Sequence, residues 1–343
     1  MTQGNSELNP SEDTGQAGPA YMPSVSGALR FVLGLGVGVL VAIGVGYATG
    51  VRPADVVRYA SGVSPWLVVG CVASSFVVLA FQSARWHAVM WPLLRLTYGQ
   101  AYRAQIVGFM FNAFLPARGG DLLRVQYLGR RTGKSRATIL GTEVVDRWLD
   151  WWGWIPTFLV LCLVSHPPFW LYKALGIFGG VLLGWAVVML LLTRRGWSPG
   201  GDTRFARVWA ALKAGITAFR SPRIWAIALL LGPLPWLWES LAISVAAQVF
   251  GIDISWLMAF SVLIGFNLAM VVPSPGALGS VEAGGTAALL FFGVDQSKAM
   301  AFMFIYHLTQ LLPGVIGGVV LLIVERERLF GPKATLAKVE NEP

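Results

Sequence analysis

One short stretch of the sequence carries four charged residues at helical spacing, namely Glu143, Asp146, Arg147 and Asp150. Separations of three, four and seven positions would put all four on one face of a helix. The stretch is otherwise apolar, and charges at membrane depth normally face a bundle interior or a cavity. Three acids exceed what one arginine needs, which favours a site for a lipid head group, a proton or a counter-ion. An internally paired cluster that only orients its helix is the alternative.

A second polar group surrounds a break at Pro116 and Gly119, and its members are Asn112, Arg118, Asp121 and Arg124. A helix that begins after the glycine would aim its backbone N–H groups and positive dipole end at an anion. Arg118 and Arg124 could then bind a phosphate. Asp121 would lie in the first turn, where it can simply complement the dipole. Arg124 can equally be a basic residue on the cytoplasmic side.

A later break has the sharper backbone signal, because two prolines and two glycines within 273–279 preclude a regular helix. Ser280 offers an N-cap, with Glu282 in the first turn. We expect a half-helix terminus that faces substrate, and a tight turn between two short helices is the alternative. The candidate site residues of this region are Asn267, Pro273, Gly276, Gly279, Ser280 and Glu282.

Two more ionisable residues lie inside apolar stretches and complete the candidate substrate-binding set. Glu239 lies beside two prolines, and a lone glutamate at membrane depth is a functional candidate, although an interhelical hydrogen bond would also satisfy it. For His307 the ordinary role is packing and hydrogen bonding. Cys71 and Cys162 lie in apolar runs without metal-ligand spacing, so neither a metal nor a cofactor is expected.

Composition indicates a membrane protein. Mean hydropathy is +0.64, hydrophobic residues make up 55% of the chain and charged residues 13%, whereas soluble domains are roughly 25% charged. Several runs reach the roughly 20 apolar residues that cross a bilayer. The net charge of +9 comes from short loops between these runs, which is typical of cytoplasmic loops rather than of nucleic-acid binding.

The elements that must position these residues are predicted to be α-helical throughout. We expect an all-α polytopic membrane protein with six full spans and two broken re-entrant hairpins, or eight spans. The predicted spans are 31–49, 66–84, 137–164, 171–192, 224–250 and 298–324, and the hairpins are 102–129 and 254–292. They form one membrane domain over 29–325, between a disordered tail at 1–28 and a tail at 326–343.

The two breaks carry the same residues in the same order. Gly108, Phe109, Pro116 and Gly119 return 157 positions later as Gly265, Phe266, Pro273 and Gly276. Matched breaks in two halves of a membrane protein are typical of a transport site near the midplane. An odd number of crossings in each half, 29–164 and 171–325, predicts an inverted repeat. Lys and Arg in alternate loops put both termini in the cytoplasm, with the hairpins entering from opposite faces.

Three blocks of this sequence, 112–124, 143–150 and 273–282, resemble a known family. They are similar to the signature blocks of the lysylphosphatidylglycerol synthase transmembrane-domain family, also called flippase-like, over roughly residues 30–325. The resemblance implies an integral protein of the bacterial inner membrane. It also implies that the protein moves or presents a lipid with a phosphate-containing head group.

The leading hypothesis is a flippase-like protein that binds and translocates a phospholipid or a polyprenyl-phosphate lipid and is not an enzyme. Only 19 residues follow Val324, so an aminoacyl-transfer domain is not expected. One alternative is an intramembrane lipid-modifying enzyme in which Glu143, Asp146 and Asp150 hold Mg²⁺. Another is a scaffold partner of a lipid synthase or glycosyltransferase. A homo-oligomer stays open, and no nucleic-acid partner is expected.

Overall fold

The computed structural model describes residues 53–113, 115, 118–164, 169–194, 203–270, 272 and 275–324. The predicted span 31–49, both tails, and Pro116 and Pro273 of the two breaks lie outside these residues. The first helices are α2 (Pro53–Ser61), α3 (Pro65–Leu94), α4 (Tyr98–Asn112), α5 (Gly120–Thr132), α6 (Arg136–Trp152), α7 (Trp154–Val164) and α8 (Phe169–Arg194). They are followed by α9 (Arg204–Ile216), η2 (Thr217–Arg220), α10 (Pro222–Leu230), α11 (Leu234–Val249), α12 (Trp256–Ala269), η3 (Pro275–Ala277), α13 (Ser280–Phe291) and α14 (Gln296–Val324).

Every regular element in these described ranges is a helix, and several are long and apolar enough to cross a membrane. The candidate spans are Pro65–Leu94, Leu175–Arg194, Pro222–Val249 and Gln296–Leu321. They overlap the predicted spans 66–84, 171–192, 224–250 and 298–324. The prediction of an all-α polytopic membrane fold is therefore confirmed.

The predicted continuous span 137–164 is two helices, because α6 ends at Trp152 and α7 begins at Trp154. Pro156 lies in the first turn of α7 and has no N–H to continue the helical hydrogen bonds across the junction. Gly153 at the junction packs directly on the backbone of another segment. A Cβ there would lie 2.2 Å from the carbonyl oxygen of Gly232.

Both predicted hairpin segments consist of two helices with a break between them. α4 packs along α5, and α12 packs along α13. Glycines allow each pair to come close: a Cβ on Gly120 would lie 2.1 Å from the carbonyl oxygen of Gly108, and one on Gly284 would lie 2.4 Å from that of Gly265. Gly108 and Gly265 are the residues that the 157-position offset relates, so matching positions support both helix pairs.

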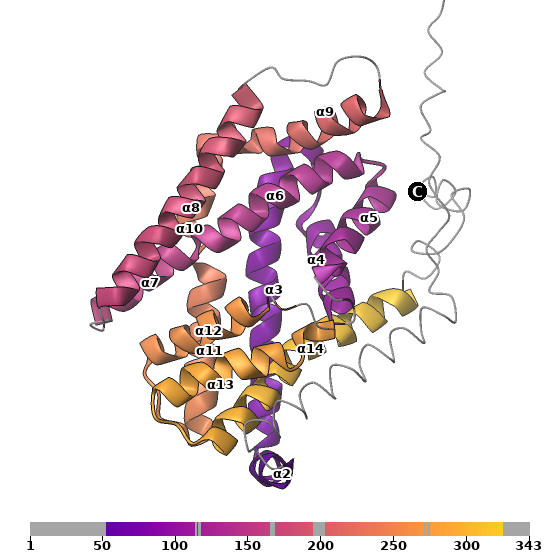
Figure 1. Cartoon of the computed structure of the whole chain (residues 1–343). Helices are drawn as coiled ribbons and strands as arrows, with labels where there is room; N and C mark the ends of the chain where they lie inside the picture. Colours follow the sequence, from indigo (N-terminus) through magenta and orange to yellow (C-terminus); the bar gives the residue numbers. More distant parts are fainter. Residues whose placement is uncertain are drawn as a thin grey trace, which may run out of the picture.

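The two halves also share an order of helix contacts. α3 packs on α4 and α5 on α6, while α11 packs on α12 and α13 on α14. α3 runs through the middle of the molecule in Figure 1 and contacts α11 of the other half. The later part of α14 crosses onto α4, where Gly314 comes within Cβ-contact distance of the Phe109 backbone. The halves therefore interlock rather than lie apart.

Candidate functional site

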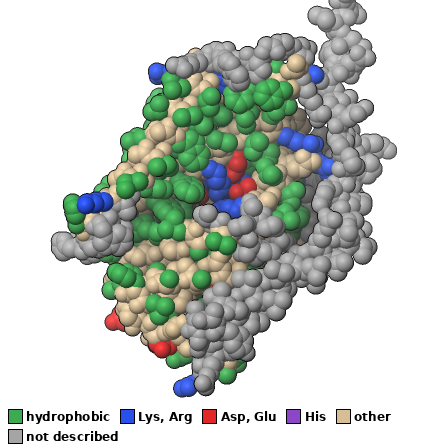
Figure 2. Space-filling model, in the orientation of Figure 1, with side chains coloured by type: hydrophobic (Ala, Val, Ile, Leu, Met, Phe, Trp, Pro, Cys, Tyr) green, Lys and Arg blue, Asp and Glu red, His purple; other side chains and the backbone are tan. Residues whose placement is uncertain are grey.

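Four arginines and four carboxylates gather where α3, α5 and α6 meet. They are Arg85 of α3, Arg118 directly before α5, Asp121 and Arg124 of α5, and Glu143, Asp146, Arg147 and Asp150 of α6. We call these eight residues the charged cluster. In Figure 2, Arg or Lys and Asp or Glu side chains lie together in a recess of an otherwise largely apolar face. The formal charges of the cluster sum to zero.

Arg85 anchors the buried end of the charged cluster. Its Nε lies 2.8 Å from Oδ1 of Asp146, and its Nη1 lies 2.8 Å from Oδ1 of Asp150. The side chains of Arg85 and Asp146 are each 1% exposed. Two acids of α6 are thereby neutralised by one arginine of α3, which joins helices far apart in the sequence.

Arg124 is an internal link rather than an open phosphate ligand. Its Nη2 donates to Glu143 and its Nη1 donates to Gln105. The guanidinium carbon lies 4.5 Å from the centre of the Trp86 ring, which adds a cation–π contact. The side chain is 1% exposed, so its hydrogen-bonding groups face the protein interior.

Arg147 ties α5 to α6. Its Nε lies 2.8 Å from Oε1 of Glu143, its Nη1 3.3 Å from Oδ2 of Asp150, and its Nη2 3.4 Å from Oδ2 of Asp121. The four residues that sequence spacing put on one face of α6 do lie together, and Arg147 is the most exposed of them. A single arginine that contacts three acids holds the middle of the cluster.

Arg118 differs from the other three arginines in exposure and pairing. Its side chain is 46% exposed, and its single described ion pair is a loose one, with Nε 3.7 Å from Oδ2 of Asp121. It has a φ of 55°, a left-handed conformation that is uncommon outside glycine and turns the chain at the entry to α5. Arg118 is therefore the most exposed arginine of the charged cluster and the one with the loosest ion pair.

Asp121 lies in the first turn of α5, outside the four candidate spans. Burial raises the pKa of this carboxyl, but the charges of Arg147, Arg124 and Arg118 outweigh burial and hold the pKa below its ordinary value. Asn112 supports the same turn: its Oδ1 accepts the Gly120 N–H at 2.8 Å, and its Nδ2 donates to Asp121 at 3.1 Å. Asn112 thus positions the start of α5 and the acid in its first turn.

Glu282 of the second break and His307 of α14 form a separate buried pair. Oε2 of Glu282 accepts the Gly279 N–H at 2.7 Å, and Oε1 lies 2.8 Å from Nδ1 of His307. The prediction that Ser280 caps α13 is wrong, because Gly279 occupies the cap position with a φ of 84°. The Ser280 hydroxyl instead donates to the carbonyl of Ala277. This group fixes the start of α13.

Other predicted residues lie apart from the charged cluster or at its margin. The Asn267 amide donates to the carbonyl of Leu263, a bond within its own helix. Gly276 touches the other hairpin, since a Cβ there would lie 2.8 Å from the carbonyl oxygen of Ala113. Glu239 is partly buried in α11. Pro273 lies outside the described residues.

Sequence reasoning missed Arg85 and Gln105. Arg85 directly follows the predicted span 66–84, yet α3 continues to Leu94. Two features of the sequence could have indicated its role: apolar residues continue after Arg85, and the stretch 143–150 carries more acids than its one arginine can pair. Gln105 joins Arg124 to Gln82, with Nε2 of Gln105 3.0 Å from Oε1 of Gln82. Nothing in the spacing of two glutamines indicated this role.

The arrangement of donors does not resemble a metal site. Within the described ranges, no three His, Cys, Asp or Glu side chains are grouped as ligands for a metal ion. The carboxylates of the charged cluster each lie near an arginine. Their chemistry is that of charge-assisted hydrogen bonds.

The fold and the charged cluster define an all-α polytopic membrane protein with a polar centre. The family model described as the lysylphosphatidylglycerol synthase TM region matches residues 30–318, and the chain belongs to this family. The resemblance found in the sequence is thereby confirmed, and it gives the protein a lipid-related role in a membrane. No curated protein and no solved structure matches the chain.

Proposed function

We propose that the protein binds a lipid with a phosphate-containing head group at the charged cluster and translocates it across the membrane. Membership of a lipid-related membrane family supports the class of ligand. The observation that carries the proposal is the contrast between Arg118 and the other arginines of the cluster. Arg118 is 46% exposed and loosely paired, whereas Arg85 and Arg124 are each 1% exposed.

Arg118 suits a phosphate for chemical reasons. A guanidinium makes bidentate hydrogen bonds with phosphate oxygens. The loose contact with Asp121 can be given up because Asp121 also lies within 3.4 Å of Arg147. The acid therefore stays paired when Arg118 turns to a ligand, and the buried part of the cluster need not rearrange.

Glu239 is the acid best placed for a cationic or hydroxylated part of the head group, or for a coupling proton. Asp146 and Asp150 are occupied by Arg85, so they serve a ligand less readily than the sequence suggested. In the part of the chain that the structure describes, Glu239 has no ion pair. Its carboxylate therefore has no described arginine or lysine to give up before a cation or proton approaches.

Movement would come from rocking of the two halves against each other. The shared order of helix contacts supports an internal repeat, and the contact of Gly276 with Ala113 supports hairpin tips that meet. Basic loops on one side favour cytoplasmic termini in a bacterial inner membrane. Re-entry of the hairpins from opposite faces would give the site access to each side in turn.

Transport of labelled lipid by the purified protein in proteoliposomes tests the proposal. Wild-type protein should move a head-labelled phospholipid between leaflets and leave it chemically unchanged. Mass spectrometry of the recovered lipid separates this outcome from the enzyme hypothesis, because a modified product would overturn the flippase assignment. If the protein is folded but moves lipid in neither direction, the flippase assignment is also overturned.

A further inference from the structure

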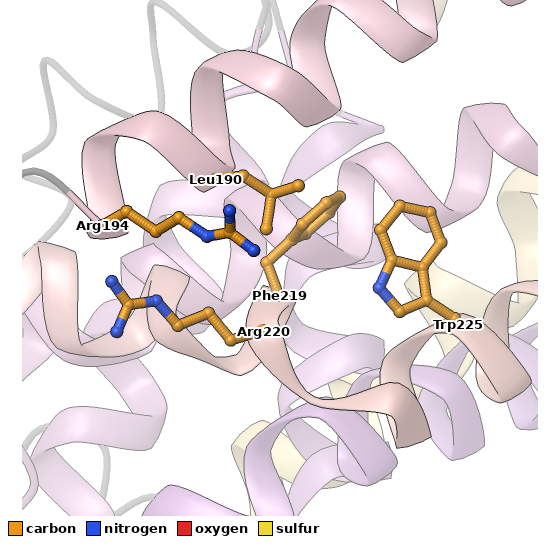
Figure 3. A pocket seen from close by; sticks show the side chains of 5 residues that line it. All are labelled: Leu190, Arg194, Phe219, Arg220 and Trp225. Carbon is orange, nitrogen blue, oxygen red and sulfur yellow. The ribbon is translucent and has the colours of Figure 1, made fainter.

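A pocket of about 410 Å³ lies away from the charged cluster, near the end of α8. Its lining residues are Leu190, Arg194, Phe219, Arg220 and Trp225. In Figure 3 the two arginine side chains lie one above the other beside Leu190 and Phe219, with the Trp225 ring on the far side. The pocket therefore has a basic end and an aromatic end, and none of these residues belongs to the proposed transport site.

Two of the residues that line the pocket, Phe219 and Arg220, are held by contacts with neighbouring elements. Phe219 is fully buried, and its ring centre lies 4.7 Å from that of Trp148 and 5.3 Å from that of Trp225. Arg220 donates from Nη2 to the carbonyl oxygen of Thr193, which fastens η2 to the last turn of α8. Packed rings thus hold the aromatic wall of the pocket, and a hydrogen bond holds Arg220 beside it.

The charge of the pocket selects for an anion. Arg194 and Arg220 both contribute a guanidinium, and no acidic side chain is among the residues that line it. Arg220 has donors left beyond its bond to Thr193, since a guanidinium carries five N–H groups. Two guanidiniums around one space match a phosphate, whose oxygens accept several charge-assisted hydrogen bonds.

The position of the pocket favours a lipid over a free phosphate. Arg194 is the last residue of the candidate span Leu175–Arg194. Leu183, Val187 and Leu191 precede it at helical spacing and are 55%, 52% and 42% exposed. An apolar helix face therefore leads along the span to the basic pocket at its end. A phospholipid has this same order of parts, with acyl chains along the span and a phosphate at the membrane surface.

We infer that this pocket binds the phosphate head group of an anionic phospholipid, with the acyl chains lying along the exposed face of α8. The site is separate from the charged cluster and holds lipid at the surface near the α8 end. Arg194 and Arg220 bind the phosphate, and the rings of Phe219 and Trp225 wall the glycerol end of the lipid.

Native mass spectrometry of the full chain, titrated with phosphatidylglycerol or with phosphatidylcholine of the same acyl chains, tests this site. Phosphatidylglycerol should be retained in preference. Arg194→Gln should lower its retention about fivefold, the order expected for one basic residue acting on an anionic lipid. Arg223→Gln, which removes an exposed arginine of α10 outside the pocket, should leave retention unchanged.

A second variant tests the pocket without a change in charge. Leu190→Trp fills the pocket and leaves both arginines in place, so it should also lower retention of phosphatidylglycerol. Equal losses in Arg194→Gln and Arg223→Gln would overturn the site in favour of general surface charge, and full retention by Leu190→Trp would show that lipid binds elsewhere. Inorganic phosphate that competes as well as the lipid at equal concentration would overturn the lipid assignment.

Discussion

Arg85 and Asp146 form the most deeply buried ion pair of the charged cluster, with Nε 2.8 Å from Oδ1 and each side chain 1% exposed. The pair joins α3 to α6, and Arg85 also contacts Asp150. Burying such a pair costs desolvation energy. Removal of one partner is strongly destabilising, because it leaves the other charge buried without compensation. Arg118, by contrast, is the most exposed arginine of the cluster, at 46%.

Replacement of Arg85 by Gln should strongly destabilise the protein. Buried Asp146 would lose its arginine and Asp150 would keep only Arg147, at a cost of about 3–5 kcal/mol in the free energy of unfolding. Chemical denaturation in detergent measures this loss. The double variant Arg85→Gln with Asp146→Asn should recover part of it, because one uncompensated charge is removed. A wild-type unfolding midpoint in the single variant would contradict the structural role of Arg85.

Gly120→Ala should open the contact between α4 and α5. The added Cβ would lie 2.1 Å from the carbonyl oxygen of Gly108, so backbone must shift, at a cost of about 1–3 kcal/mol. Gly99→Ala is the matched control in α4, since a Cβ there meets nothing within 4 Å. This substitution should raise the stability of the protein slightly. Unfolding midpoints of the two variants should move in opposite directions. Equal midpoints would show that the glycine contact is not tight.

Glu282→Ala should weaken the start of α13. The change removes the acceptor of the Gly279 N–H and the partner of His307, both inside the protein. A buried polar group without a partner costs about 1–3 kcal/mol. Glu282→Gln keeps an oxygen acceptor and should lose less, so the two variants are compared by thermal unfolding in detergent. If both variants lose the same stability, the carboxylate does not cap the helix as described.

The part of the site on α5 and α6 could be predicted from sequence because its residues are close in the chain. Spacing alone put Glu143, Arg147 and Asp150 on one helical face, and the structure joins them through Arg147. The Pro/Gly break likewise indicated a helix that begins near Gly120, with Asp121 in its first turn. Local periodicity is sufficient where the interacting groups belong to one helix or to its start.

Contacts between distant helices could not be predicted in this way. Arg85 pairs with Asp146 across 61 positions, and no single-sequence pattern specifies which helices pack together. The break at Gly153 was missed for a similar reason, because its cause includes close approach to Gly232. Ser280 was favoured as a cap by residue type, yet the left-handed backbone at Gly279 decided where α13 begins.

Lipid movement by Arg118→Gln in proteoliposomes tests the central claim most directly. The loose pair of Arg118 with Asp121 contributes little to stability, so this variant should fold normally, unlike variants of the buried arginines. Loss of a charge-assisted hydrogen bond worth about 1.5–3 kcal/mol should slow translocation roughly tenfold or more. Arg223→Gln is the matched control and should translocate lipid at the wild-type rate.

The measurement uses a head-labelled phospholipid and a membrane-impermeant reductant that bleaches label in the outer leaflet alone. With wild-type protein, label from both leaflets should be bleached as lipid exchanges between them, and with Arg118→Gln the inner-leaflet label should bleach much more slowly. A wild-type rate of bleaching in folded Arg118→Gln would contradict the account, because the open arginine of the charged cluster would then have no part in lipid translocation.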